Sequence, residues 1–189
     1  MTPVPAHELV LRPAVVADAP CLSALAGQVF LDTYATDGIT PWFVRELDEH
    51  LGMATIAALL ARDDTRFVLA ELAGRLIGFT QSTFATTHAL VSTPAARAVE
   101  LDRLYVQRPF LGRAVGTALL RRAEADALSA GASTLWLTAW FGNDRARRFY
   151  ASRGYADLGA TTYTFDGESF ENRLFAITLP PARAPRITA

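Results

Sequence analysis

A glycine-bearing turn between a predicted strand and a predicted helix is the first feature of this sequence that could bind a ligand. The strand covers 100–106, and Gly112 and Gly116 frame the turn before the helix continues. The first backbone N–H groups of a helix have no partner within the helix and lie at the positive end of its dipole. The turn therefore predicts a site for an anion such as a phosphate or a pyrophosphate.

Two common phosphate-binding motifs do not fit this turn. A P-loop places a lysine and then a serine or threonine after its last glycine, whereas Gly116 is followed by Thr117 and Ala118 in a chain without lysine. The dinucleotide fingerprint needs three glycines, and only two are present here. The sequence therefore predicts neither P-loop hydrolysis nor dinucleotide binding.

The same stretch resembles the acyl-CoA site of the GNAT N-acetyltransferase superfamily, whose signature at a strand-to-helix turn is Gln/Arg-x-x-Gly-x-Gly/Ala. Here the segment reads LGRAVG at 111–116, so Leu111 replaces the usual polar residue and Ala114 replaces the first signature glycine. A second block, NDRARRFY at 143–150, is similar to the family's Asn-x-x-Ala-x-x-Phe-Tyr element. Both blocks occur in the order and at the spacing of the family.

This resemblance implies acetyl-CoA as the cofactor. The strand residues 104–106 would hold the pantetheine arm like an added strand, and the amides of the turn would bind the pyrophosphate. Ala114 is expected to fit the turn with a negative φ. The implied cofactor-binding residues are Leu104, Tyr105, Val106, Gly112, Arg113, Ala114, Val115, Gly116, Thr117, Asn143, Phe149 and Tyr150.

Acetyl transfer to an amine needs a base, because an alkylammonium has a pKa near ~10 and must lose a proton first. Glu100 is the leading candidate, since it precedes Val106 at the offset of the catalytic glutamate in histone-acetylating members of the superfamily. Burial would raise its pKa toward neutrality. Asp102 on the same face and a water molecule are alternatives, and an ion pair with Arg103 or simple solvation is the competing interpretation of Glu100. Alternation places Arg103 on the opposite face.

The resemblance also implies an oxyanion donor and a general acid. The donor would be a backbone N–H near Leu104, where family members splay the central strand from its neighbour. Tyr150 would protonate the departing sulfur, because a phenol with a pKa near ~10 is protonated at neutral pH. Ordinary packing is the competing interpretation of Tyr150, and helix N-capping fully explains Asn143.

The residues that follow the first strand are candidates for contact with the acceptor. They are Tyr34, Trp42, Phe43 and Glu46, and the corresponding part of the family fold walls the acceptor pocket. Glu100, the leading base, is also a candidate for contact with the acceptor. The competing interpretation is that Trp42 and Phe43 fill the core. The implied acceptor is a primary amine of a small molecule, polyamine-like or an amino acid, or a peptide N-terminus. Without a nucleophile motif such as Gly-x-Ser-x-Gly, direct attack in a ternary complex is expected.

Hydrophobic periodicity predicts the elements that position these residues. The sum is a single α/β (α+β) domain over 1–180, with a mixed, mostly antiparallel sheet of six to seven strands, helices on both faces, a splayed central strand and a flexible tail over 181–189. The predicted strands are 8–12, 67–72, 76–84, 100–106, 134–139, 155–165 and 170–179, and the predicted helices are 18–30, 41–51, 53–61, 115–130 and 143–152.

The composition narrows the classes of function. A formal net charge of −1 gives no electrostatic basis for nucleic-acid binding, and no apolar run approaches the ~20 residues that span a bilayer. The N-terminus lacks the pattern of a secretory signal, so a cytoplasmic location is expected. The three histidines have no partner at ligand spacing, so no metal site is expected. A homodimer is compatible with the superfamily, and the exclusive use of arginine indicates GC-rich coding, as in some bacteria.

Two other functions are compatible with parts of the sequence. The departures at Leu111 and Ala114 favour a non-catalytic, acyl-CoA-binding regulatory module, whereas Glu100, Asn143 and Tyr150 favour an enzyme. A site for another phosphorylated ligand would use the same helix N-terminus without the thioester.

Overall fold

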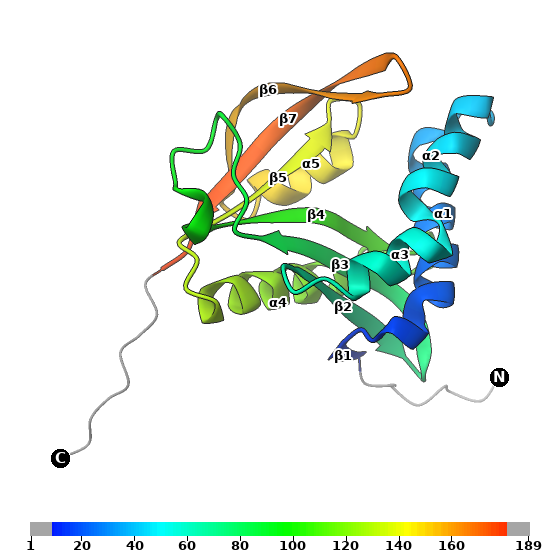
Figure 1. Cartoon of the computed structure of the whole chain (residues 1–189), viewed down its shortest axis with the longest axis horizontal. Helices are drawn as coiled ribbons and strands as arrows, with labels where there is room; N and C mark the ends of the chain where they lie inside the picture. Colours follow the sequence, from blue (N-terminus) through cyan, green and yellow to red (C-terminus); the bar gives the residue numbers. More distant parts are fainter. Residues whose placement is uncertain (1–8, 181–189) are drawn as a thin grey trace.

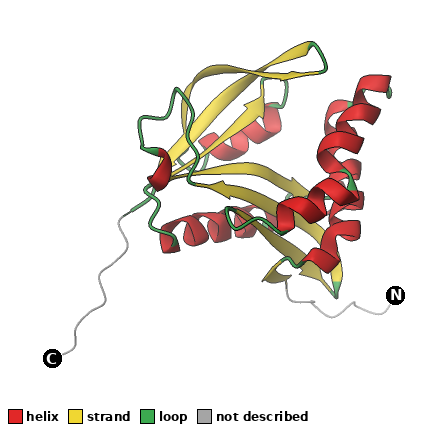
Figure 2. Ribbon diagram, viewed as in Figure 1, coloured by secondary structure: helices red, strands yellow, loops and turns green. Residues whose placement is uncertain are grey.

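The computed structural model describes residues 9–180 and has one seven-stranded sheet with helices on both faces (Figures 1 and 2). The predicted α/β class and mostly antiparallel sheet are confirmed: the strand order is β1-β2-β3-β4-β5-β7-β6, and only β4 and β5 pair in parallel. Glu8 and the predicted tail 181–189 lie outside the described residues. The elements are β1 (Leu9–Pro13), α1 (Ala19–Tyr34), α2 (Pro41–Leu51), α3 (Met53–Leu60), β2 (Thr65–Leu72), β3 (Arg75–Phe84), β4 (Ala98–Val106), α4 (Val115–Ser129), β5 (Thr134–Trp140), α5 (Asp144–Ala151), β6 (Ala156–Phe165) and β7 (Glu168–Thr178).

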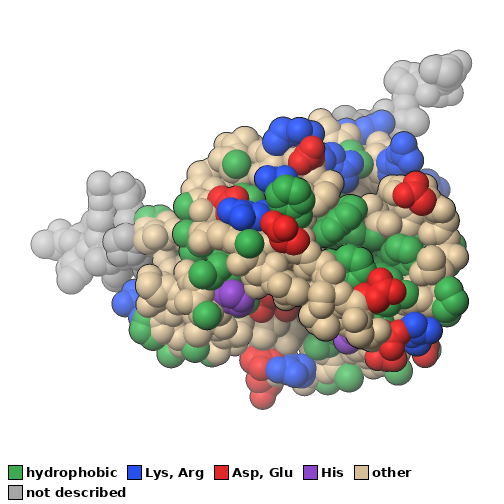
Figure 3. Space-filling view, turned by 90° about the horizontal axis from the view of Figure 1, so that it is seen from above, with side chains coloured by type: hydrophobic (Ala, Val, Ile, Leu, Met, Phe, Trp, Pro, Cys, Tyr) green, Lys and Arg blue, Asp and Glu red, His purple; other side chains and the backbone are tan. Residues whose placement is uncertain are grey.

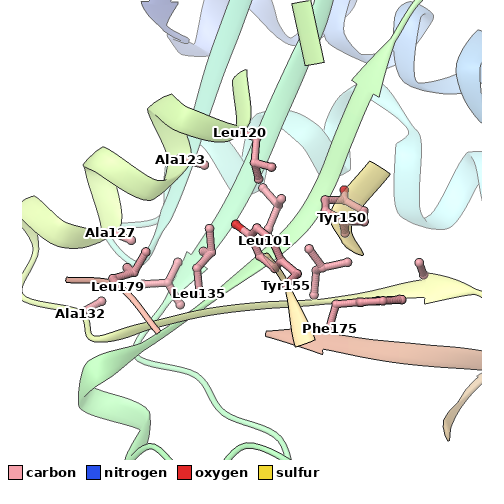
Figure 4. Packing of buried hydrophobic residues seen from close by; sticks show 13 residues of the cluster. Leu101, Leu120, Ala123, Ala127, Ala132, Leu135, Tyr150, Tyr155, Phe175 and Leu179 are labelled. Carbon is pink, nitrogen blue, oxygen red and sulfur yellow. The ribbon is translucent and has the colours of Figure 1, made fainter. Parts of the chain in front are cut away.

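The central strand β4 separates two hydrophobic cores. Val99 and Leu101 pack with α4 and α5 on one face, in a cluster that includes Leu120 and Tyr150. Figure 4 shows Tyr150 and Ala132 at opposite ends of this cluster. On the other face, Tyr105 packs against the core beneath α1 and α3. Because apolar side chains leave both faces of β4, helices must cover both, and β4 is held at the centre of the molecule.

Two-residue turns close two hairpins of the sheet. Ala73-Gly74 joins β2 to β3, and Asp166-Gly167 joins β6 to β7. In each turn both residues have positive φ, at 52° and 70° in the first and 50° and 78° in the second. This is the type I′ geometry that suits the right-handed twist of hairpin strands. The antiparallel pairing expected at both positions is confirmed.

Helix ends follow the residues that favour them, with one exception. Pro41 opens α2, and Gly131 closes α4 with φ 82° while the Ala132 N–H donates to the Ala127 carbonyl, as in a Schellman motif. The prediction that the first helix ends at residue 30 was wrong, because α1 continues through Tyr34. The Tyr34 ring lies 5.0 Å from Phe30, so packing outweighs the turn-forming sequence there.

A bulge in β4 changes the direction of one side chain. Leu101 pairs with Ser82 and Arg103 pairs with Gln81, so Asp102 is the extra residue. A bulge interrupts the strict alternation of side chains along a strand. The prediction that Arg103 lies on the face opposite Asp102 was therefore wrong: both side chains line the same cavity, together with Tyr105.

Candidate active site

The strands β4 and β5 pair over three residues and then separate. Their parallel register runs from Ala98 opposite Thr134 to Glu100 opposite Trp136. On the other edge of β4, the Gln107 N–H donates to the Ile77 carbonyl at 2.9 Å. Since hydrogen-bonded and non-bonded pairs alternate in an antiparallel ladder, the N–H and C=O groups of Leu104 and Val106 point toward the gap. The splayed strand thus offers backbone donors and acceptors to a ligand.

A cavity of about 570 Å³ lies beside these free backbone groups. It runs between β4, the turn before α4, and α5, with α1 along one side. The predicted cofactor residues that line it are Leu104, Tyr105, Val106, Gly112, Ala114, Gly116, Thr117, Asn143, Phe149 and Tyr150. Two predicted residues do not line it. The Val115 side chain is buried in the core beneath α4, and the Arg113 guanidinium carbon lies 5.7 Å from the Phe110 ring centre.

The turn before α4 has a left-handed backbone at two positions. Gly112 has φ 74°, and Ala114 at the N-cap of α4 has φ 61° and ψ 2°. The prediction of a negative φ at Ala114 was therefore wrong. The chain has to reverse sharply between β4 and α4, and this left-handed step is the conformation that a glycine adopts without cost. Ala114 reproduces the glycine geometry at an expected cost of about 1 kcal/mol.

We expect Ala114→Gly to stabilise the protein by about 0.5 kcal/mol, because relief of left-handed strain exceeds the added entropy of the unfolded chain. Denaturant unfolding measures the change. The matched control is Ala118→Gly in the interior of α4, which should lower the free energy of unfolding by about 1 kcal/mol. If Ala114→Gly and Ala118→Gly lower the free energy of unfolding by the same amount, Ala114 carries no strain.

Arg153 is a cavity residue that the sequence reasoning missed. Its guanidinium donates to the Thr117 hydroxyl at 2.6 Å and to the Phe149 carbonyl at 2.8 Å, and it lies 3.6 Å from the centre of the Phe149 ring. The arginine therefore ties α5 to the first turn of α4 and adds positive charge to the cavity. Arg153 lies two residues after Ala151, the last residue of α5, so helical spacing in the sequence does not predict its contact with Phe149.

The segment 143–150 supplies the N-cap of α5 and a buried phenol. The Asn143 side-chain oxygen accepts from the Ala146 N–H at 3.0 Å, so Asn143 caps α5 while it lines the cavity. Tyr150 is 8% exposed, and its ring packs on Tyr155 and Phe175. Burial raises the pKa of Tyr150, with the nearby Tyr105 adding to the rise and Arg153 opposing it. The phenol is therefore protonated at neutral pH.

A second cavity, of about 220 Å³, lies on the face of β4 that α1 and α2 cover. All of the predicted acceptor residues except Glu100 line it, namely Tyr34, Trp42, Phe43 and Glu46. Glu46 is buried and accepts hydrogen bonds from the Tyr163 hydroxyl at 2.9 and 3.0 Å. Trp42 donates to the Phe165 carbonyl at 3.2 Å. The β6–β7 hairpin thus closes this cavity against α2.

The two cavities meet at a pair of tyrosines. Tyr34 and Tyr105 line both of them. The Tyr34 ring also lies 5.7 Å from Trp140 of β5. Burial raises the pKa of both phenols, so they are neutral at physiological pH. A thioester in the larger cavity and an amine in the smaller one would approach each other at this junction, beside the splayed backbone of β4.

Two partly buried carboxylates lie close to the smaller cavity. Burial first, and then the neighbouring Asp102, raise the pKa of Glu100 to about 7, while Arg103 opposes the rise. Burial also raises the pKa of Asp102, which accepts a hydrogen bond from the Thr83 hydroxyl at 2.8 Å. Asp102 lines the cavity, whereas Glu100 is not among the lining residues. Raised pKa values suit a proton acceptor that works near neutral pH, and of the two carboxylates Asp102 is the one that lines the cavity.

Comparisons with known proteins agree with this geometry. A family model described as "Acetyltransferase (GNAT) family" matches residues 29–155. An uncharacterised N-acetyltransferase of Mycobacterium tuberculosis is 29% identical over 156 residues, which cover 82% of this chain and 93% of that protein.

Two solved structures share the fold. A GCN5-related N-acetyltransferase from Rhodopseudomonas palustris has a TM-score of 0.71 and 25% identity, covering 94% of this chain and all of that one. The PaiA N-acetyltransferase of Thermoplasma acidophilum, in complex with coenzyme A, has a TM-score of 0.69 and 21% identity. The match covers 88% of this chain and 98% of that one.

On the face in Figure 3, acidic and basic side chains are interspersed, so this face presents no large field of one sign. Within residues 9–180, none of the helices combines the length and the apolar character needed to cross a bilayer.

Proposed function

The chain belongs to the GNAT acetyltransferase family, and we propose that it transfers the acetyl group of acetyl-CoA to the primary amine of a small molecule by direct attack in a ternary complex. The observation that carries this proposal is the meeting of two cavities at Tyr34 and Tyr105. The larger cavity lies beside the free backbone groups of β4, and the smaller one is mostly aromatic, with two partly buried carboxylates close to it.

The larger cavity fits coenzyme A. Gly116 in the first turn of α4 leaves room for a ligand, because a side chain there would extend toward Phe149 and Leu104 on the cavity wall. The amides of 112–117 and the charge of Arg153 suit a pyrophosphate. The backbone of Leu104 and Val106 suits the amides of a pantetheine arm. Acetyl-CoA is the cofactor of this family and supplies an activated acetyl thioester.

Four groups of the chain would carry the chemistry. A free backbone N–H near Leu104 would donate a hydrogen bond to the carbonyl oxygen as negative charge develops on it. Tyr150 would donate its proton to the departing sulfur. Asp102 and Glu100 would accept the proton that the ammonium of the acceptor must lose, with Asp102 at the cavity wall and Glu100 coupled to it.

We expect kcat/KM of the wild-type enzyme to rise with pH through about 7, the pKa of Glu100. Glu100→Gln should remove this rise and lower the plateau by about 10- to 100-fold, because the pair loses one proton acceptor. The matched variant is Asp102→Asn. If only Asp102→Asn changes the profile, Asp102 is the base, and if neither variant does, a water molecule serves instead.

Glu100→Gln should also change the pH dependence of stability. The folded protein holds the Glu100 proton up to about pH 7, above the ordinary carboxyl pKa of 4.5, so its contribution to stability is complete below pH 4.5 and is lost as the pH rises to about 7. The variant should therefore be more stable than the wild type at pH 8, by at most about 3 kcal/mol, and not at pH 4. Urea unfolding at the two pH values measures this difference, which separates a buried carboxyl from a solvated one.

A thiol-release assay tests the proposed function. Purified protein is incubated with acetyl-CoA and a panel of amino acids, amino-acid amides, simple alkylamines and spermidine, and free coenzyme A is detected with a thiol reagent. Calorimetry with acetyl-CoA, ATP and NAD runs in parallel. Amine-dependent thiol release with binding of acetyl-CoA alone is the expected result. Binding without acetylation of any amine would contradict the acceptor class that we propose.

A further inference from the structure

Arg103 is a cation on the wall of the smaller cavity, the proposed acceptor site, and it has no anionic partner among residues 9–180. Its Nη1 donates to the side-chain oxygen of the buried Gln81. No carboxylate within residues 9–180 forms an ion pair with it. A guanidinium carries five N–H donors in a planar fork, so most of its donors are available to a ligand.

The two carboxylates on the cavity wall have partners of their own. Asp102 accepts from the Thr83 hydroxyl, and both oxygens of Glu46 accept from the Tyr163 hydroxyl. Neither therefore neutralises Arg103 directly. The bulge at Asp102 turns the Arg103 side chain to this side of the sheet. Burial raises the pKa values of five groups around the cavity, and the positive charge of Arg103 partly offsets each rise. These groups are Tyr34, Tyr105, Tyr163, Glu100 and Asp102.

We propose that Arg103 binds the carboxylate of the acceptor, and that the acceptor is a free amino acid or a similar small amino carboxylate with an apolar side chain. This inference rests on the proposed function and narrows its substrate class. A guanidinium and a carboxylate form paired, charge-assisted hydrogen bonds that fix orientation as well as affinity. Arg103 is thus assigned as a substrate-binding residue that determines specificity.

The rest of the cavity fits such a molecule. In an α-amino acid one carbon separates the carboxylate from the amine, so a carboxylate on Arg103 leaves the amine close to Asp102 and to the junction at Tyr34 and Tyr105. An apolar side chain would face the wall formed by Phe30, Trp42, Phe43, Leu51 and Phe170. The volume of about 220 Å³ suits a ligand below drug size.

Other amines match the cavity less well. A polyamine has no anionic group and would bring a second ammonium into the cavity that holds the Arg103 guanidinium, which is a like-charge contact. A peptide N-terminus presents a neutral amide where the free amino acid has its carboxylate. The amide can accept a hydrogen bond but cannot neutralise the guanidinium.

The test compares three acceptors that share one side chain: L-leucine, L-leucinamide and isopentylamine, with equivalent sets for the other apolar amino acids and with spermidine. We expect kcat/KM of the wild-type enzyme for the best acid to exceed that for its amide and its amine by about 100-fold. In Arg103→Met this ratio should fall below about 5, mainly through a higher KM for the acid. Arg103→Lys should give an intermediate ratio, because it keeps the charge without the fork.

The matched control is Arg75→Met, the same change at an exposed position in the β2–β3 hairpin, which should leave the ratio at its wild-type value. The inference is overturned if amides, amines or spermidine are acetylated and no carboxylate-bearing acceptor is, or if Arg103→Met keeps the wild-type ratio. In both cases the proposed acetyltransferase function stands. If no amine of any kind is acetylated, the proposed function and this inference both fail. Even if Arg103→Met does not fold, the kcat/KM values of the wild-type enzyme for the acid, its amide and its amine still test the inference.

Discussion

Tyr150→Phe should lower kcat by about 100-fold, which is within the usual contribution of a general acid. The phenol lines the cofactor cavity at the end of a packed cluster, and its hydroxyl forms no hydrogen bond with residues 9–180. Phenylalanine therefore keeps every ring contact and leaves no polar partner unsatisfied. The affinity for acetyl-CoA and the melting temperature should remain close to the wild-type values.

The expected size of this effect depends on the order of the chemical steps. A thiol has a pKa near ~8.5 and a phenol near ~10, and burial raises the pKa of Tyr150 further. Complete transfer of the proton before the carbon–sulfur bond breaks is therefore unfavourable. Donation as the bond breaks is favourable, because negative charge then grows on the sulfur and strengthens the hydrogen bond. Arg153 assists, since its charge lowers the pKa of Tyr150.

Steady-state kinetics and acetyl-CoA calorimetry measure these quantities. The control is Tyr155→Phe, five residues beyond the second block. This tyrosine packs in the same cluster but donates to the Glu124 carboxylate at 2.9 Å and lines neither cavity. It should lose about 1 to 2 kcal/mol of stability and keep kcat near the wild-type value. A kcat for Tyr150→Phe within threefold of the wild type would remove Tyr150 from the role of general acid.

Local sequence signals predicted the elements and much of the site. Turn residues such as Asp166-Gly167 fix the hairpins, and the block at 143–150 brings Asn143 and Tyr150 to one cavity because they share one short helix. These features depend on neighbours within a few residues. The same is true of the glycine turn before α4, where Gly112, Ala114, Gly116 and Thr117 line the cavity in spite of the change to Ala114.

The features that sequence reasoning missed depend on contacts between distant segments. The bulge at Asp102 exists only in the pairing of β4 with β3, so strict alternation put Arg103 on the wrong face. The left-handed φ of Ala114 is set by the path from β4 to α4, whereas alanine by itself favours a negative φ. The extension of α1 to Tyr34 depends on packing against Trp140 of β5. The smaller cavity is lined largely by residues from such distant segments, namely α1, α2, β4, β5, β6 and β7.

Gly116→Trp should abolish detectable binding of acetyl-CoA, a loss of at least 100-fold in affinity. Gly116 stands in the first turn of α4 and lines the cofactor cavity. A Cβ at this position would lie 3.5 Å from the Phe149 ring and 3.6 Å from the Leu104 side chain, which are ordinary contacts. The backbone therefore accepts a side chain, and an indole can extend only into the space between Phe149 and Leu104 where the cofactor would bind.

The matched control is Gly116→Ala, whose methyl group meets the same two neighbours without filling the cavity. Alanine also favours the helix over glycine by about 1 kcal/mol, so this variant should be at least as stable as the wild type and bind acetyl-CoA within about threefold. Calorimetry and thermal unfolding of the three proteins separate a blocked site from a misfolded one. If Gly116→Trp folds and still binds acetyl-CoA with wild-type affinity, the cofactor lies elsewhere, and the roles assigned to Tyr150 and Leu104 are lost with this cavity.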